Sequence, residues 1–251
     1  MRRLAALAAL GFALAPPPAA AKDFCRAQEF AGEGYSVCAF DVKADPLRLY
    51  WLDSAGLPYA SLGALTRALE DKGQTLAFGM NAGMFKPDAS PVGLYVEGGR
   101  QLRKADTKAG RANFRLLPNG VFWIGMGEAG VTETTRYLAA PPNAVYATQS
   151  GPMLVIDGKL HPRIHSNGTS LKIRNGVCVK DKTQVSFAIS DGPVTFYAFA
   201  TLFRDALHCK DALFLDGSVS SLYAPTFGRS DQLEVLGPLV GLAAPKDATK
   251  P

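Results

Sequence analysis

The sequence predicts an α+β protein, a single domain with a mixed β-sheet core and a few packed helices. Many short apolar or alternating segments, bounded by glycine, proline, asparagine and aspartate, are typical of strands. Only two stretches place apolar residues at helical spacing. Helices so few, set among so many strands, favour this class over a doubly wound α/β fold.

The N-terminal residues have the features of a cleavable signal peptide over residues 1–21. Arg2 and Arg3 precede an apolar run over residues 4–15, and an Ala-x-Ala cleavage site follows at residues 19–21. The apolar run is shorter than the roughly 20 residues that a membrane-spanning helix needs, and no later segment is long and apolar enough. We therefore expect a secreted or periplasmic protein with no membrane span.

After this segment, a single domain is expected over residues 22–242. No serine- and glycine-rich linker, internal repeat or low-complexity tract interrupts residues 22–240. The remaining residues, 243–251, are expected to form a disordered tail.

Eight segments have the apolar pattern of strands and alternate with turn residues. In chain order they are Tyr35–Phe40, Leu47–Leu52, Leu76–Met80, Gly93–Glu97, Val121–Ile124, Met153–Ile156, Val185–Ser190 and Leu213–Leu215. The pair Asp157-Gly158 is a tight-turn signal, and Lys159-Leu160 then returns along the preceding strand. A β-hairpin is therefore expected at this point.

Two helices are expected. The first covers Leu62–Lys72, where Ser61 is a favourable N-cap and Gly73 is a stop signal. The second covers Tyr197–His208, where large apolar side chains recur every four residues and would bury aromatic area against the strands. Both helices are expected to pack on the sheet.

The mature chain retains four cysteines, Cys25, Cys38, Cys178 and Cys209. In an oxidising compartment an even number favours disulfides, and three connectivities are possible. Pairing Cys25 with Cys38 and Cys178 with Cys209 closes two local loops, and we favour it for that reason. Zinc is the weaker alternative, because neither the cysteines nor the three histidines have metal-ligand spacing. No metal and no cofactor is predicted.

The mature chain would carry 25 basic and 22 acidic residues, a balance too mild to indicate nucleic acid as a partner. One segment is strongly basic, because six cations lie within sixteen residues beside the single acid Asp106. The cations are Arg100, Arg103, Lys104, Lys108, Arg111 and Arg115. A solvated loop is the ordinary interpretation of this segment, and a guide for an anionic substrate is the alternative.

Five turns after strands combine glycine with polar side chains, which lets backbone N–H groups approach a ligand closely. They are Asn81–Phe85, Gln149–Pro152, Arg174–Gly176, Ser190–Gly192 and Asp216–Ser221. Glycine beside asparagine or aspartate is also ordinary turn chemistry, so each turn alone is a weak signal.

Asp216 is the leading catalytic candidate, because it follows the apolar run Leu213–Leu215 and precedes a glycine, which places a carboxylate at a sheet edge. Its alternative role is to cap the turn through the amides of Ser218 or Val219. Arg174 could either pair with a structural acid or grip a phosphate with its forked guanidinium. Nucleotide-binding glycine loops and the nucleophile elbow of α/β-hydrolases are absent from the sequence.

Six segments taken in order resemble the phosphodiester glycosidase family, the bacterial relatives of the uncovering enzyme, N-acetylglucosamine-1-phosphodiester alpha-N-acetylglucosaminidase. They are Asn81–Phe85, Pro91–Leu94, Asn119–Phe122, Gln149–Leu154, Arg174–Val177 and Leu215–Ser221. The resemblance extends from about Tyr35 to Tyr223. Ala82 and Met84 depart from the family pattern, and Ser218 replaces a second glycine, which either changes the turn or adds a hydroxyl facing the ligand.

The resemblance implies hydrolysis of the glycosidic bond of a sugar 1-phosphodiester, which releases free sugar and a phosphomonoester. Phosphate is a better leaving group than an alkoxide, so Arg174 could assist its departure. Asp216 would act as general base or nucleophile, and Asp191 is the second candidate carboxylate. Residues expected to hold substrate are Asn81, Gly83, Gln149, Ser150, Asn175, Ser218, Ser220 and Ser221. The expected partner is a phosphorylated carbohydrate or an envelope glycan.

Two other functions are compatible with these residues. A non-catalytic envelope protein that binds carbohydrate or phosphoglycan would hold its ligand with Arg174 and Asn81, and Asp216 would only cap a turn. A metal-dependent phosphodiesterase would need histidines and aspartates clustered around two metals, and the sequence does not display such clustering.

Overall fold

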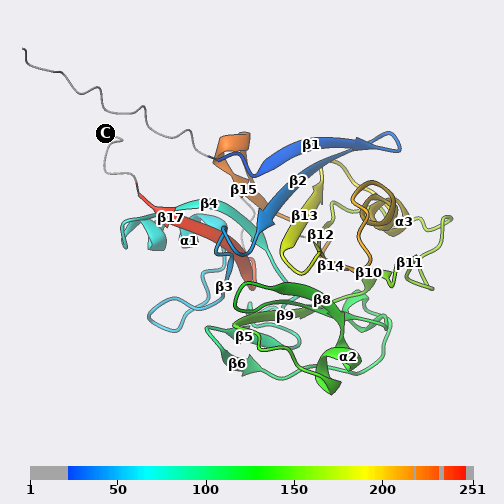
Figure 1. Ribbon diagram of the computed structural model, residues 1–251, viewed down its shortest axis with the longest axis horizontal. Helices are drawn as coiled ribbons and strands as arrows, with labels where there is room; N and C mark the ends of the chain where they lie inside the picture. Colours follow the sequence, from blue (N-terminus) through cyan, green and yellow to red (C-terminus); the bar gives the residue numbers. More distant parts are fainter. Residues whose placement is uncertain (1–21, 218, 232–234, 247–251) are drawn as a thin grey trace, which may run out of the picture.

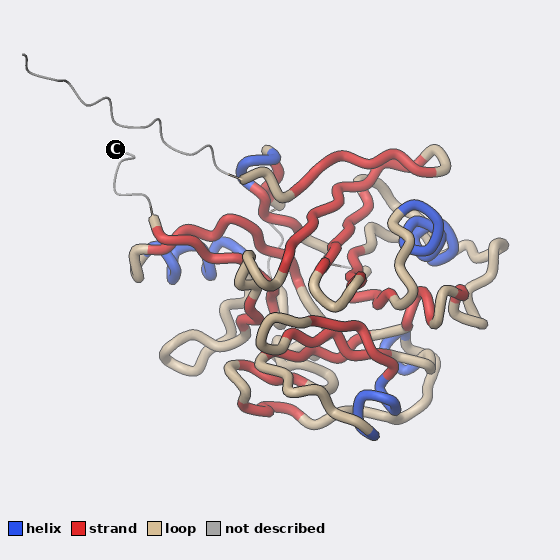
Figure 2. Tube along the Cα trace, in the orientation of Figure 1, coloured by secondary structure: helices blue, strands red, loops and turns tan. Residues whose placement is uncertain are grey.

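Three β-sheets make up the computed structural model, which describes residues 22–217, 219–231 and 235–246 (Figure 1). The predicted signal peptide and Ser218 lie outside the described residues. Strands dominate the trace and the helices are short, as Figure 2 shows. The prediction of a strand-rich core with a few helices is therefore confirmed.

The largest of the three described sheets has seven strands. Its strand order is β1 (Cys25–Phe30), β2 (Glu33–Asp41), β13 (Gln184–Ser190), β12 (Asn175–Lys180), β14 (Ala212–Asp216), β10 (Met153–Ile156) and β11 (Lys159–Leu160). The predicted hairpin at Asp157-Gly158 joins β10 to β11. Asn175, at the start of β12, lies opposite Asp216, at the end of β14. Polar residues far apart in the sequence therefore meet at one end of this sheet.

Two five-stranded sheets complete the fold. One has the order β16 (Arg229–Ser230), β15 (Leu222–Ala224), β4 (Gln74–Asn81), β17 (Leu239–Pro245) and β3 (Arg48–Tyr50). The other has the order β6 (Arg100–Arg103), β5 (Tyr95–Glu97), β9 (Tyr146–Ser150), β7 (Gly120–Ile124) and β8 (Ala129–Glu133). All described strand pairs run antiparallel where a mixed sheet was expected, because hairpins and other returning connections join the strands.

The three sheets share one aromatic core. Phe40 of β2 and Phe187 of β13 meet Phe78 of β4, with ring centroids 4.6 Å apart for Phe40 and Phe78 and 5.3 Å apart for Phe78 and Phe187. Phe122 of β7 adds an edge-to-face contact with Phe187 at 5.6 Å. All four rings are buried. Because large rings bury much apolar surface, this cluster fixes the sheets relative to one another.

Both predicted helices are present, and their ends differ from the expectation. The Oγ of Ser61 accepts the N–H of Ala64 (3.1 Å) at the start of α1 (Leu62–Glu70), which confirms the N-cap. The predicted second helix is divided into α3 (Phe196–Thr201) and the π-helical turn η2 (Leu202–Ala206). The remaining helical elements are α2 (Thr134–Ala139), η1 (Asn113–Arg115) and η3 (Pro225–Phe227). No helix in the described ranges is long and apolar enough to cross a membrane.

The first three residues of the disordered tail that was expected over residues 243–251 belong to the last strand. Ala243 pairs with Leu76, and Pro245 pairs with Gln74, so residues 243–245 belong to β17 and the domain continues past residue 242. Pairing with β4 overrides the loop-like composition of this segment. The disulfides Cys25–Cys38 and Cys178–Cys209 are formed as predicted.

Candidate active site

A cavity of about 350 Å³ opens where β12 begins and β14 ends. Its wall includes the carboxylate-bearing residue Asp216 and the guanidinium-bearing residue Arg174, and we call it the Asp216 cavity. The other lining residues are Met84, Phe85, Ala112, Asn113, Phe114, Ser170, Lys172, Gly217 and Val219. The two leading candidates from the sequence therefore share one cavity.

Asp216 is fixed at the point where the chain leaves the core. All five residues of β14 are buried, and Asp216 is the last of them, with 9 % of its surface exposed. The backbone N–H of Asp216 donates to Oδ1 of Asn175 (2.9 Å), and the N–H of Gly217 donates to Oδ1 of Asp216 (2.5 Å). The carboxylate thus accepts a bond within the turn from Gly217, whereas the predicted alternative named the amides of Ser218 or Val219, and Asp216 also borders the cavity.

Arg174 is a buried cation, with 1 % of its surface exposed. Its Nε donates to the carbonyl oxygen of Val194 (2.9 Å) and its Nη2 to the carbonyl oxygen of Ser170 (2.7 Å). The guanidinium also lies 3.7 Å from the ring centroid of Phe196. Burial lowers the pKa of Arg174 to about 10, so the group remains charged at neutral pH. Within the described part of the chain it has no ion pair with a carboxylate, which favours an anionic ligand.

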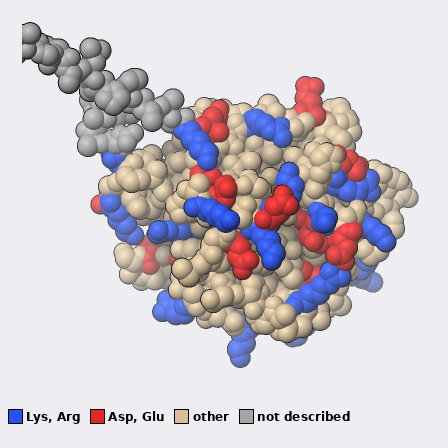
Figure 3. Space-filling model, viewed as in Figure 1, with Lys and Arg blue, Asp and Glu red and all other residues tan. Residues whose placement is uncertain are grey.

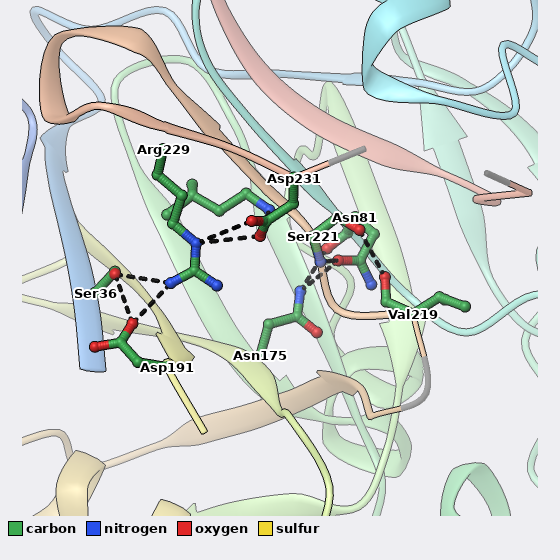
Figure 4. Close-up of polar contacts among 9 residues, drawn as sticks. Ser36, Asn81, Asn175, Asp191, Val219, Ser221, Arg229 and Asp231 are labelled. Carbon is green, nitrogen blue, oxygen red and sulfur yellow. Dashed lines mark hydrogen bonds and ion pairs between the residues drawn. The ribbon is translucent and has the colours of Figure 1, made fainter. Parts of the chain in front are cut away.

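Most of the other predicted substrate contacts are buried polar residues, which we call the buried polar layer; Figure 4 shows Asn81, Asn175 and Ser221 of this layer. The layer comprises Asn81, Gln149, Ser150, Asn175, Ser220 and Ser221. The Nδ2 of Asn175 donates to the carbonyl oxygen of Asn81 (2.8 Å), and Oδ1 of Asn81 accepts the N–H of Ser221 (2.9 Å). Ser220 donates through Oγ to the carbonyl oxygen of Asp216 (3.0 Å). These bonds tie β4, β12 and the turn after β14 together.

Gln149 and Ser150 also bond to backbone groups. Gln149 Nε2 donates to the carbonyl oxygen of Asp106 (2.8 Å), and Ser150 Oγ donates to that of Leu215 (2.8 Å). Gly83 permits this packing, because a Cβ there would lie 2.5 Å from the carbonyl oxygen of Gln149. None of these three residues is among those that line the Asp216 cavity.

Asp191, the second predicted carboxylate, lies outside the Asp216 cavity. Its Oδ1 accepts the hydroxyl of Ser36 (2.9 Å) and pairs with Nη1 of Arg229 (2.7 Å), as Figure 4 shows. Arg229 also pairs with Asp231 (3.1 Å). The structure therefore does not bring Asp191 and Asp216 into one cavity. Over the described ranges, no three histidine, cysteine, aspartate or glutamate side chains come together as metal ligands.

The sequence analysis did not single out Lys172 or the segment Ala112–Phe114, although both line the cavity. Lys172 lies two residues before Arg174, and a second cation in the same turn was the available signal. Ala112–Phe114 belongs to the basic segment Arg100–Arg115, whose end therefore borders the cavity. None of the six cations of the segment lines the cavity, and Arg115 pairs with Asp106 (2.8 Å), so its role as a guide for an anionic substrate stays a prediction.

A carboxylate and a buried guanidinium in one cavity are suited to acid–base or nucleophilic chemistry on an anionic ligand. The sequence model of the phosphodiester glycosidase family matches residues 74–235, a range that contains both side chains. The chain belongs to this family.

Three known proteins are similar to this chain over most of their own length. The protein YigE of Escherichia coli (strain K12), which is uncharacterized, is 32% identical over 216 residues, covering 85% of this chain and 83% of YigE. The catalytic domain of zebrafish N-acetylglucosamine-1-phosphodiester alpha-N-acetylglucosaminidase, auto-inhibited by its pro-peptide, has a TM-score of 0.60 at 11% identity, covering 87% of this chain and 81% of that one. A protein of Burkholderia pseudomallei K96243 has a TM-score of 0.53 at 12% identity, covering 84% of this chain and 74% of that one. The two solved structures share the fold.

Proposed function

We propose that the protein hydrolyses the glycosidic bond of a sugar 1-phosphodiester and releases free sugar and a phosphomonoester. The observation that carries this proposal is the presence of Asp216 and the buried cation Arg174 in one cavity of a phosphodiester glycosidase family member. The zebrafish structure of similar fold is that of a glycosidase of N-acetylglucosamine 1-phosphodiesters, which supports the same substrate class.

In the proposed reaction, the cations of the cavity and the carboxylate of Asp216 have different roles. Arg174 and Lys172 hold the phosphate and stabilise the negative charge that develops when the bond between C1 and the phosphate oxygen breaks. The bonding electron pair leaves with that oxygen, and a water oxygen bonds to C1. As general base, Asp216 accepts the proton of this water. As nucleophile, it would first form a glycosyl ester that water then hydrolyses to the same products.

The buried polar layer has a positioning role in this proposal. Asn175 holds the backbone of Asp216, and Asn81 holds the next turn through Ser221, so the carboxylate is fixed before substrate binds. A rigid frame of this kind reduces the loss of freedom that accompanies reaction.

The proposed site of action is the periplasm or the exterior of the cell. Two disulfides join all four cysteines of the described residues, which fits an oxidising compartment. Phosphorylated envelope glycans would supply sugar 1-phosphodiesters there.

Incubation of the purified mature protein with a panel of sugar 1-phosphate diesters tests the proposal. Free sugar together with a phosphomonoester is the expected pair of products. Sugar 1-phosphate would instead indicate a phosphodiesterase. Binding without any product would indicate the non-catalytic carbohydrate-binding function.

A further inference from the structure

A second and larger cavity lies at the opposite end of the same strands. It has a volume of about 620 Å³ and adjoins the end of β12 and the start of β14. β14 has five residues, so its two ends lie four steps apart, roughly 13 Å at about 3.3 Å per residue. We call it the basic groove, because Lys180, Lys182, His208 and Lys210 line it. Trp123 also lies in its wall.

The lysines of the basic groove lack carboxylate partners. Among the described residues, the ion pairs include none of Lys180, Lys182 and Lys210. Two acids also line the groove, Asp181 and Asp211, and Oδ1 of Asp211 accepts the N–H of Asp157 at 3.1 Å. Basic and acidic side chains are interspersed on the face that Figure 3 shows. Three ammonium groups against two carboxylates favour an anionic ligand.

The walls of the groove are joined covalently. The disulfide Cys178–Cys209 links β12 to the segment before β14. Lys180 follows one half of this bridge by two residues, and His208 and Lys210 flank the other half. The basic side chains on the two walls are therefore held at a fixed separation, which lowers the entropy lost when a ligand binds both.

The hairpin that carries Lys182 has an unusual sequence for its conformation. Asp181 and Lys182 have φ angles of +51° and +61°, a pattern that favours glycine at the second position. The hairpin between β10 and β11, whose loop is one residue shorter, uses Asp157 and Gly158, with φ angles of +48° and +77°. A lysine in the left-handed region costs about 1 kcal/mol or more. Its side chain lines the groove, which is a reason for lysine at this position other than the turn.

Trp123 provides an aromatic surface beside these cations. It lies opposite Gly130 in the pairing of β7 with β8, and a Cβ on Gly130 would lie 2.6 Å from the indole ring. The indole therefore packs across the glycine backbone. Its Nε1 donates to Oγ1 of Thr132 (3.0 Å), which fixes the orientation of the ring. Trp123 is half-buried, so part of it remains available to the groove.

We propose that the basic groove is a second binding site, separate from the Asp216 cavity, for a phosphorylated saccharide. The apolar face of a sugar ring would pack on Trp123, and its phosphate would lie between Lys182 and Lys210. One indole suits one sugar ring, whereas strands of nucleotides are held by several stacking rings in series. The choice of a saccharide also rests on the proposed function.

The test uses maltopentaose that carries one phosphomonoester, a probe with no glycosidic phosphodiester to hydrolyse. The signal is tryptophan emission of the mature protein minus that of Trp123→Phe, which isolates Trp123 from Trp51. We expect a saturable change with this probe and binding at least about tenfold weaker for unphosphorylated maltopentaose. The double variant Lys182→Gln with Lys210→Gln should weaken binding by roughly fivefold, and less at high salt.

Lys72→Gln is the matched control, because Lys72 is an exposed lysine just beyond α1 that does not line the groove. It should leave binding unchanged. The double variant should still hydrolyse a small diester at the normal rate, so failure of the groove and failure of the proposed function give different results. Unchanged Trp123 emission, equal binding by the double variant, an identical signal with inorganic phosphate alone, or tighter binding of pentathymidylate would each overturn the proposal.

Discussion

The wall of the Asp216 cavity and the buried polar layer contain similar residues in similar turns, but the two regions satisfy their polar groups differently. In the layer, Asn175 and Asn81 bond to each other and to the backbone of neighbouring strand ends. In the wall, Lys172 and Asn113 are exposed, and Arg174 has no carboxylate partner among the described residues. A polar residue near glycine therefore indicates the end of the sheet where polar side chains gather, without indicating which of them line the cavity.

The largest expected effect is that of Asp216→Asn. The amide keeps the size of the side chain but cannot accept the proton of water or attack C1, so kcat should fall by about 10²- to 10⁴-fold while ligand binding persists. The backbone bond from Asp216 to Asn175 does not need the carboxylate. Steady-state kinetics on a sugar 1-phosphodiester measure the effect, and the melting temperature checks the fold.

Asp191→Asn is the matched control, since Asp191 is a carboxylate paired with Arg229 outside the cavity. It should keep activity within a few-fold of the unmodified protein. A loss in Asp191→Asn with normal activity in Asp216→Asn would transfer the catalytic role to Asp191. Unfolding of Asp216→Asn would leave turn capping as the role of that residue.

Arg174→Lys should have the next largest effect. The ammonium keeps a charge but cannot reproduce the two bonds of the guanidinium to Val194 and Ser170. We expect kcat/KM to fall by about 10- to 100-fold for phosphate leaving groups and only slightly for an activated aryl glycoside. Equal losses on both substrates would instead assign Arg174 a structural role. Lys172→Gln, at an exposed position, should cost less.

Asn175→Ala should act mainly on stability. It removes the acceptor of the Asp216 N–H and the donor to Asn81, which leaves buried backbone groups without partners. We expect the free energy of unfolding to decrease by about 1–3 kcal/mol in urea denaturation. Asn113→Ala, at an exposed asparagine of the cavity wall, is the matched control and should leave stability unchanged. Equal stability of the two variants would contradict the division into wall and layer.

The smallest expected effect is that of the buried side chain His161 on the pH dependence of stability. It compares a buried with an exposed polar group that can titrate. Burial lowers the pKa of His161 from its usual 6.5. The unfolded chain therefore binds the proton more readily, and stability should fall as pH decreases below about 6.5 until the folded protein also binds it. His161→Gln should flatten this dependence in denaturation curves measured between about pH 7 and pH 5, whereas His165→Gln, at an exposed position, should not. An identical pH dependence in both variants would exclude His161 as its source.

Local features of the fold were predictable because they depend on neighbouring residues. The cap at Ser61, the hairpin at Asp157-Gly158 and the two disulfides follow from short-range patterns, and the structure confirms them. The strand order was not predictable in this way, because pairing such as that of β2 with β13 joins segments far apart in the chain. The same applies to the end of β17, where pairing with β4 orders residues that read as a tail.

The candidate site was predictable in part for the same reason. An aspartate directly before a glycine and an arginine in the turn Arg174–Gly176 indicated Asp216 and Arg174, which the structure brings to one cavity. The sequence could not distinguish these from Asn175, because its bonds to Asn81 and Asp216 depend on which strand ends meet. Lys172 was missed, although a second cation two residues before Arg174 was an available signal. Whether the predicted residues contact substrate stays a prediction.

The most direct test of the central claim is hydrolysis of a sugar 1-phosphodiester in water enriched in heavy oxygen. If Asp216 directs water to C1 and Arg174 stabilises the departing phosphate, the phosphomonoester retains its original oxygens and mass spectrometry finds no heavy oxygen in it. Asp216→Asn should then form this product far more slowly. Heavy oxygen in the phosphate group would show that water attacks phosphorus, and would contradict the assignment of this cavity to glycosidic cleavage.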